Sequence, residues 1–277
     1  MPNKAVALAL STHPGPTLAV TAVAVLLGFG VGLDPARLAL LGLAFLFDQA
    51  SIGLSNDWLD AEQDRAVARR DKPVARGWIG AGAVRTAAFA AAGLAVVLTL
   101  PLGLLATLAH VVVLAFAWAY NLSLKGTKLS VLPYIISFGL LPMIVTLARP
   151  TPALAAWWAM SMGALLGVAA HFTNVLPDLD DDRRTGVRGL PHRLGTRGSG
   201  VVTCLALAAA SVLAVFGPRG VTTPLRWAGL GLTLAIATVV ATLVLTRPPR
   251  RLLFQLIIAA ALINVVLLAS TGERILA

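Results

Sequence analysis

Two short polar segments hold most of the carboxylates of an otherwise apolar sequence. Nine of its 12 acidic residues lie in them. The first acidic segment, 56–71, contains Asp57, Asp60, Glu62, Asp64 and Asp71. The second acidic segment, 174–182, contains Asp178, Asp180, Asp181 and Asp182. Clustered carboxylates repel one another and are costly to desolvate beside apolar segments, so the arrangement is favoured where divalent cations lie between them. The two segments therefore predict metal-dependent chemistry.

The spacing of these residues predicts a row of oxygen ligands in each segment. On a helix, Asp57, Asp60 and Asp64 stand at i, i+3 and i+7 and share a face, with Asn56 on its flank. The second acidic segment steps by four residues through Asn174, Asp178 and Asp182. Oxygen-only ligands suit Mg²⁺ better than zinc or copper, and Mg²⁺ is commonly shared between a few carboxylates and phosphate oxygens. We therefore expect a phosphorylated substrate.

Basic residues accompany both acidic segments. Lys72 follows the first, Arg188 follows the second, and Lys125 lies in a connection between them. Cationic side chains are expected at these places if a diphosphate has to be bound and the charge of the departing group neutralised. For any one of these residues, the alternative that it only fixes membrane topology stays open.

The remainder of the chain has the composition of a polytopic membrane protein. Of its 277 residues, 58% are hydrophobic and 12% charged, and the mean hydropathy is +0.85. The apolar runs are continuous rather than alternating, which favours helices over a membrane barrel. We predict one all-α domain, 1–277, with about nine transmembrane helices. The apolar runs lie near 16–33, 37–55, 83–102, 104–122, 130–148, 153–173, 199–217, 226–246 and 251–270.

The distribution of basic residues predicts the orientation of the chain. Most Lys and Arg residues lie in the connections after the second, fourth, sixth and eighth apolar runs. By the positive-inside rule, these connections, both acidic segments and the N-terminus face the cytoplasm, and the C-terminus lies outside. We expect a multi-pass protein in the lipid bilayer of a bacterial inner membrane. This topology, with attraction to anionic lipid or phosphate, accounts for the net charge of +10, so nucleic acid is not an expected partner.

These motifs resemble those of the UbiA superfamily of intramembrane prenyltransferases. The family's first motif, NDxxDxxxD, is matched by Asn56, Asp57, Asp60 and Asp64. A basic-Pro-x-x-x-Gly element is similar to Lys72-Pro73 with Gly77, and a Tyr-x-x-x-Leu-Lys element is similar to Tyr120 with Leu124-Lys125. The second motif resembles Asp178, Asp182, Gly186, Arg188, Leu190 and Leu194-Gly195. The four motifs occur in the family's order and, with the apolar runs, cover most of the chain.

The resemblance implies a function and the roles of individual residues. It implies a helical bundle around a central cavity, Mg²⁺ as cofactor, a prenyl diphosphate as donor and a lipophilic, aromatic acceptor such as a quinone precursor or phenol. The implied metal-site residues are Asn56, Asp57, Asp60, Asp64, Asp178 and Asp182, with Asp60, Asp64, Asp178 and Asp182 catalytic. The diphosphate would contact Lys72, Lys125, Arg188 and Tyr120.

The chain departs from the family before its first apolar run. An arginine is common there, whereas this sequence has Ser11-Thr12-His13-Pro14. Either His13 takes the place of that arginine, or the diphosphate is held without the contact. Of the properties that the resemblance implies, the identity of the substrate is the one that this departure affects most.

Two alternative functions stay open. A membrane terpene cyclase would use the same site without an acceptor, the allylic cation closing on itself. A divalent-cation transporter would line its path with aspartates, but such residues belong near the bilayer midplane, and here they stand at the ends of apolar runs.

Asp48 lies inside the second apolar run, where a carboxylate is costly. It is expected either to face the cavity, in a functional role, or to contact a hydrogen-bonding partner, in a structural role.

Overall fold

The computed structural model describes residues 2–179, 186–246 and 251–277 of the chain. Within these ranges, the side chains of 178, 244, 245 and 251–254 are not described. The secondary structure of the described residues is helical, and one isolated antiparallel bridge joins Ala155 to Leu276. The all-α class predicted from the sequence is therefore confirmed.

A long helix covers each apolar run. These helices are α2 (Pro14–Gly30), α3 (Pro35–Leu59), α5 (Ala81–Thr99), α6 (Leu104–Leu122), α7 (Leu132–Leu147), α8 (Trp157–Val175), α10 (Leu190–Phe216), α11 (Pro224–Thr246) and α12 (Arg251–Ala269). The short elements are α1 (Lys4–Ser11), α4 (Ala61–Ala66), η1 (Leu100–Leu102), η2 (Leu124–Gly126), η3 (Leu176–Asp178) and η4 (Gly272–Ile275). The α10 helix begins before the apolar run at 199–217 and is broken at Gly195.

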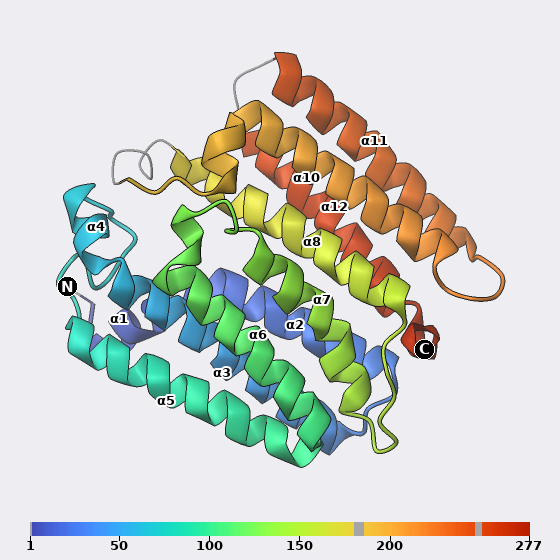
Figure 1. Ribbon diagram of the computed structural model, residues 1–277, viewed down its shortest axis with the longest axis horizontal. Helices are drawn as coiled ribbons and strands as arrows, with labels where there is room; N and C mark the ends of the chain where they lie inside the picture. The colour runs from blue at the N-terminus through green and yellow to red at the C-terminus, as the bar shows by residue number, and fades with distance from the viewer. Residues whose placement is uncertain (1, 180–185, 247–250) are drawn as a thin grey trace.

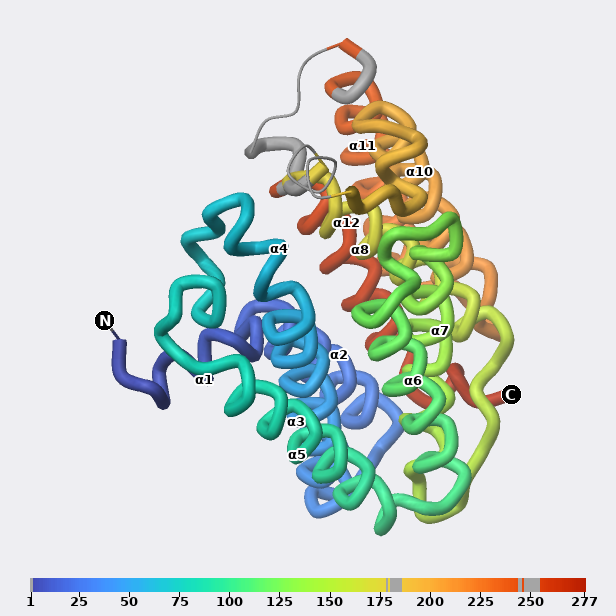
Figure 2. Tube along the Cα trace, turned by 60° about the vertical axis from the view of Figure 1, so that its left-hand side comes forward, coloured from blue at the N-terminus to red at the C-terminus, as the bar shows by residue number. Residues whose placement is uncertain are grey.

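The long helices form a closed bundle. Each long helix packs against the next one along the chain, and α12 packs against α2. Figure 2 shows α3, α4 and α5 on one side of the bundle and α10, α11 and α12 on the other. In Figure 1, α4 and the end of α8 that leads into η3 lie at the same end of the bundle, and the C-terminus lies at the opposite end. The elements that carry the two acidic segments therefore share one end of the molecule.

The number of helices that can cross a membrane is smaller than the sequence predicted. By length and apolarity, five helices of the described residues qualify: α3, α5 with η1, α6, α10 and most of α11. The pair α1 and α2, bent by 57°, would make a sixth as one broken span. The α7 helix and residues 255–269 of α12 are apolar but shorter. Nine membrane crossings therefore remain a prediction.

A second apolar core positions the first acidic segment. The main core joins helices from α2 to α12, whereas the second is smaller and lies under the segment between α3 and α5. Its buried members include Leu54 of α3, Ala61 of α4, Val74 and Ile79 of the following loop, and Val84 of α5. Burial of these side chains holds the loop against the helices on either side of it.

The elbow between α1 and α2 packs closely on α3. His13, the residue at the bend, has φ 54°, a left-handed conformation that is uncommon outside glycine. On the facing side, Gly53 of α3 leaves room for the elbow, because a Cβ there would overlap the carbonyl group of Thr12. The elbow that carries Ser11 and His13 is thus fixed against the end of α3 that carries the first acidic segment.

We expect Gly53→Ala to destabilise the fold. The added methyl group would push the Thr12 backbone away, and overpacking of this kind typically costs about 1–3 kcal/mol. The control is Gly93→Ala in α5, where a Cβ meets nothing within 4 Å and alanine is a better helix former. Thermal unfolding in detergent should show a lower Tm for the first variant and an equal or higher Tm for the second. Equal melting of both variants would contradict the close packing of the elbow.

Candidate active site

The first acidic segment lies across the junction of α3 and α4. Asn56 and Asp57 are in the last turn of α3, Asp60 follows its final residue, and Asp64 lies in α4. The helical pattern continues through the junction, since Asp60 N–H donates to the Asn56 carbonyl (2.9 Å) and Asp64 N–H to the Asp60 carbonyl (2.8 Å). Asn56, Asp60 and Asp64, at intervals of four residues, therefore follow one side of this path.

Two lysines, Asn56 and Asp60 form a continuous chain of contacts, called here the lysine–aspartate cluster. Lys72 Nζ donates to Asn56 Oδ1 (2.7 Å), and Asn56 Nδ2 donates to Asp60 Oδ2 (2.7 Å). Lys125 Nζ forms an ion pair with Asp60 Oδ1. Lys72 and Lys125 come from separate connections, so the fold brings both lysines to the residue pair that the sequence predicts as metal ligands.

Asp57 lies in a different environment from Asp60. It is 1% exposed, its Oδ2 accepts a hydrogen bond from Ser11 Oγ (2.7 Å), and its Oδ1 is 3.3 Å from Lys72 Nζ. His13 Nε2 lies 3.7 Å from the same carboxylate and 3.1 Å from Lys72 Nζ. Asp57 thus connects the α1–α2 elbow to Lys72. His13, considered from the sequence as a substitute for an arginine, does reach a predicted diphosphate residue.

Asp64 is a buried carboxylate with an unused acceptor atom. It is 8% exposed, and its Oδ2 has no hydrogen-bond partner among the described residues. Burial raises the pKa of the Asp64 carboxyl to about 6; Lys72 lowers it, and repulsion from Asp60 raises it further. A cation beside this oxygen would offset the cost of burying the charged form. Asp64, Asp60 and Asn56 supply the hard oxygen donors that Mg²⁺ prefers.

The exposed end of the first acidic segment is occupied by an ordinary surface ion pair. Arg69 donates to both carboxylate oxygens of Asp71, at 3.0 and 2.9 Å. This contact lowers the pKa of the Asp71 carboxyl to about 2. Asp71 therefore belongs to the loop surface rather than to the lysine–aspartate cluster.

The backbone around Lys125 touches the segment that follows the second acidic segment. A Cβ at Gly189 would overlap the Lys125 carbonyl oxygen, so these two backbones lie in direct contact. Ser130 Oγ accepts a hydrogen bond from Leu190 N–H (3.0 Å) and lies 3.1 Å from His171 Nε2. Arg188, one residue before Gly189, has an exposed side chain. These contacts join the Lys125 connection to the chain beyond the second acidic segment.

An aromatic cluster lies beneath this connection. Tyr120 of α6 meets Tyr134 of α7 edge to face, with ring centroids 5.3 Å apart, and His171 of α8 edge to face at 5.8 Å. Tyr134 OH accepts a hydrogen bond from Asn174 Nδ2 (3.3 Å). Tyr120, predicted from the sequence to contact diphosphate, therefore stands among aromatic rings. Ser130 and Tyr134 were not predicted as site residues from the sequence, because isolated hydroxyl groups in an apolar run form no recognisable motif.

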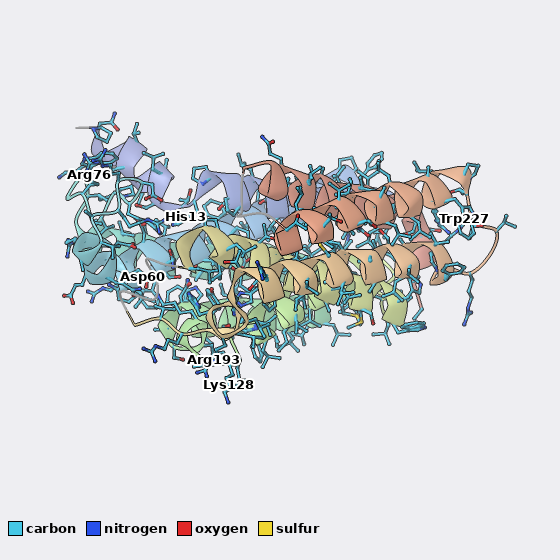
Figure 3. All side chains as sticks on the ribbon, turned by 90° about the horizontal axis from the view of Figure 1, so that it is seen from above. His13, Asp60, Arg76, Lys128, Arg193 and Trp227 are labelled. Atoms are coloured by element: carbon cyan, nitrogen blue, oxygen red, sulfur yellow. The ribbon has the colours of Figure 1, made fainter. Side chains whose placement is uncertain are left out.

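The second acidic segment is only partly described. Asp178 ends η3, and its side chain lies outside what the structure describes, whereas Asp182 lies outside the described residues altogether. Figure 3 shows His13 and Asp60 at the end of the molecule that also carries Arg76, and Trp227 at the far end. The metal-site and catalytic roles of Asp178 and Asp182 therefore stay predictions.

Asp48 has polar partners inside the bundle. It is fully buried, accepts a hydrogen bond from Gln49 Nε2 (2.9 Å) and lies 3.7 Å from His110 Nε2. His110 Nδ1 is 2.8 Å from Thr99 Oγ1. Of the two interpretations that the sequence allowed, these contacts favour a polar connection between α3, α5 and α6.

Comparison with known proteins relates the chain to curated enzymes. It is 29% identical over 177 residues to the 4-hydroxybenzoate octaprenyltransferase of Sodalis glossinidius, covering 63% of this chain and 61% of that enzyme. It is 28% identical over 189 residues to the digeranylgeranylglyceryl phosphate synthase of Pyrococcus horikoshii, covering 63% of each protein. The chain thus matches about three fifths of the length of these relatives.

Solved structures share the fold over nearly the whole chain. A UbiA homolog from Archaeoglobus fulgidus, bound to GPP and Mg²⁺, superposes with a TM-score of 0.72 at 15% identity, covering 97% of this chain and 99% of that one. The apo UbiA homolog from Aeropyrum pernix gives 0.70 at 20% identity, covering 95% and 96%. The model of the UbiA prenyltransferase family matches residues 17–268. The chain therefore belongs to the UbiA prenyltransferase family.

Proposed function

We propose that this protein is an integral-membrane prenyltransferase that moves a prenyl group from a prenyl diphosphate to a lipophilic aromatic acceptor. The observation that carries the proposal is the lysine–aspartate cluster, in which Lys72 and Lys125 flank Asn56 and Asp60. Cations next to oxygen ligands are the elements needed to hold a metal-bound diphosphate. The named activities of the relatives support the same reaction class.

The residues at the junction of α3 and α4 fit a divalent cation. Asn56, Asp60 and Asp64 offer oxygen donors, and the buried Asp64 Oδ2, which has no hydrogen-bond partner in the part of the chain that the structure describes, gives the clearest indication. Asp178 and Asp182 would complete the metal site from the second acidic segment. When bound, Mg²⁺ would neutralise the charge that develops on the departing diphosphate. Two structures of the Archaeoglobus homolog contain Mg²⁺ with a prenyl diphosphate, which supports this choice of cofactor.

The protein's own side chains would hold the diphosphate and stabilise its negative charge. Lys72 and Lys125 would turn from Asn56 and Asp60 towards the phosphate oxygens, with Arg188 and Tyr120 as further contacts, as the carbon–oxygen bond of the allylic diphosphate breaks. The electron pair leaves with the diphosphate, a nucleophilic carbon or oxygen of the acceptor captures the allylic cation, and the proton displaced from that atom passes to the released diphosphate. A central cavity among apolar helices would exclude water, which would otherwise quench that cation.

The acceptor is proposed to be aromatic. The aromatic cluster of Tyr120, Tyr134 and His171 adjoins the Lys125 connection and offers ring faces and edges to a flat substrate. Relatives named for 4-hydroxybenzoate support an aromatic acid or phenol. The curated relatives are named as transferases or synthases, so neither a cyclase nor a cation transporter is favoured.

We also propose the membrane arrangement predicted from the charge pattern. One domain of nine crossings would place α4 and η3 at the cytoplasmic face of an inner membrane and the C-terminus outside. The common end of α4 and η3, opposite the C-terminus, supports this arrangement (Figure 1).

The experiment that tests the function is a reconstituted transfer assay. Purified protein in detergent receives Mg²⁺, a prenyl diphosphate of short or long chain, and 4-hydroxybenzoate or another phenol, and the products are identified by mass spectrometry. We expect a prenylated acceptor that requires both Mg²⁺ and the acceptor. Release of a hydrocarbon from the diphosphate alone would overturn the transferase assignment in favour of a cyclase. Cation flux into liposomes without any transfer would overturn both enzyme assignments.

Lys125→Ala is expected to weaken the apparent affinity for prenyl diphosphate by about 10-fold to 100-fold, because it removes one charge-assisted hydrogen bond to phosphate. The measurement is the KM for prenyl diphosphate at saturating Mg²⁺. Lys128→Ala is the matched control, since Lys128 is exposed and three residues away. An unchanged KM in Lys125→Ala would argue against its phosphate role.

A further inference from the structure

A buried arginine without a counter-charge lies at the end of the bundle opposite the lysine–aspartate cluster. Arg226 is in the first turn of α11 and is 2% exposed. Its Nη1 atom is buried and has no hydrogen-bond partner among the described residues. None of the ion pairs formed by those residues includes its guanidinium group. Because an unpaired charge is costly to remove from water, the position favours a bound anion.

A second arginine adds to the positive charge at this end. Gly229, one turn after Arg226, packs against α12, since a Cβ there would lie 2.7 Å from the Leu267 side chain. Arg274 follows α12 at this same end, and its charge repels that of Arg226. The Arg274 side chain is exposed and forms no ion pair with the described residues. Two cations therefore lie near each other without a described acid between them.

The acidic residues of the connections at this end already have partners. Asp34 caps α3, and its Oδ2 lies 3.5 Å from Arg37 Nε. Glu273 Oε1 accepts a hydrogen bond from Arg149 Nη2 (2.8 Å). The other acidic residues of the sequence belong to the two acidic segments or to the interior of α3. The described acids of this end therefore leave the two arginines uncompensated, and an anion from outside the chain can supply the missing charge.

The surroundings of Arg226 are those of a membrane boundary. The part of α11 that is long and apolar enough to cross a membrane begins at Pro224, so Arg226 is the third residue of a candidate span. Trp227 Nε1 donates to Thr222 Oγ1 (2.9 Å), and its ring meets Phe216 of α10 edge to face, with centroids 5.6 Å apart. Figure 3 shows Trp227 at the far end of the molecule. Tryptophan at the end of a span is typical of the level of the lipid headgroups.

We propose that Arg226 and Arg274 bind the headgroup of an anionic phospholipid at this end of the bundle. The exposed Arg274 would contact the phosphate oxygens directly, through the paired hydrogen bonds that guanidinium groups form. The charge of Arg226 would strengthen the attraction from behind, because a buried charge is poorly screened by water and salt. A free phosphate ion shares this chemistry, but the span boundary and Trp227 favour a lipid as its source. The proposal is independent of prenyl transfer.

The test measures how lipids bind and stabilise the full chain in a neutral detergent without Mg²⁺ or prenyl donor. Thermal unfolding and calorimetric titration compare dioctanoyl phosphatidylglycerol with dioctanoyl phosphatidylcholine for the wild type, Arg226→Met, Arg274→Gln and Arg219→Gln. Arg219 is the control, since it is exposed in the connection between α10 and α11. We expect phosphatidylglycerol to raise the Tm of the wild type and the control more than phosphatidylcholine does. Its affinity should fall about tenfold in Arg226→Met and Arg274→Gln, and less than about twofold in the control.

The Tm without lipid separates binding from folding. Arg226→Met removes an unpaired buried charge, so it should melt at or above the wild-type temperature, and Arg226→Lys should recover part of the lipid effect. Equal stabilisation of the wild type by the two lipids would overturn the proposal. An unchanged phosphatidylglycerol affinity in Arg274→Gln would do the same, even if Arg226→Met did not fold. If inorganic phosphate alone gave the whole increase in Tm, with the same loss in the variants, the ligand would be free phosphate and the lipid assignment would be wrong.

Discussion

Asp60→Asn is expected to lower the rate of prenyl transfer by about 10³-fold, or about 4 kcal/mol of transition-state stabilisation. The substitution removes one carboxylate from the metal site and leaves a side chain of the same shape. Asp60 joins Asn56 to Lys125 in the lysine–aspartate cluster, so the change also removes the charge that positions Lys125. We expect kcat to fall and the half-saturating Mg²⁺ concentration to rise.

The fold should survive this substitution. The Asp60 and Lys125 side chains are 16% and 19% exposed, so water can solvate the lysine once its partner is neutral. Glu62→Gln is the matched control, because Glu62 lies in α4 with an exposed side chain. Rates from single-turnover assays and melting curves of both variants separate chemistry from stability. If Asp60→Asn kept a rate within about threefold of the wild type, Asp60 would not be a metal ligand of the reaction.

Asp57→Ala is expected to act mainly on stability, although the sequence groups Asp57 with the metal ligands. Its carboxylate lies between Ser11, His13 and the 6% exposed Lys72. Removing one member of a buried ion pair leaves an uncompensated charge, which commonly costs about 3–5 kcal/mol. Lys72 keeps its hydrogen bond to Asn56, so we expect a value near the lower end, about 3 kcal/mol, and a clear drop in Tm.

Ser11→Ala is a milder substitution at the same site, and its effect on stability can be compared with that of Asp57→Ala. It removes a single hydrogen bond to the same carboxylate and should cost about 1–3 kcal/mol, without releasing Lys72. The measurement is thermal unfolding of the two variants in the same detergent, with transfer activity recorded below both melting transitions. A variant Asp57→Ala that melts like the wild type yet has lost its Mg²⁺-dependent activity would place Asp57 directly on the metal instead.

The sequence by itself determined the class of the protein and predicted the composition of its site. Continuous apolar runs have few ways to satisfy their backbone in lipid, so each predicted run became a helix, such as α6 at Leu104–Leu122. Four motifs in order indicated the family that the family model then matched over residues 17–268. Acidic and basic residues are rare in such a chain, which is why their spacing was informative.

The tertiary structure decided which of these residues meet. The sequence predicts both Asp57 and Asp60 as metal-site residues, yet contacts with an elbow 46 residues earlier direct the first towards Ser11, and Lys125 pairs with the second. The close approach of Gly189 to Lys125 also depends on packing between distant segments. Helical periodicity is a local property that can be recognised from the sequence. The partner of a buried polar side chain depends on the tertiary fold, because a polar group can be buried at low cost only where the fold supplies a hydrogen-bonding or charged partner.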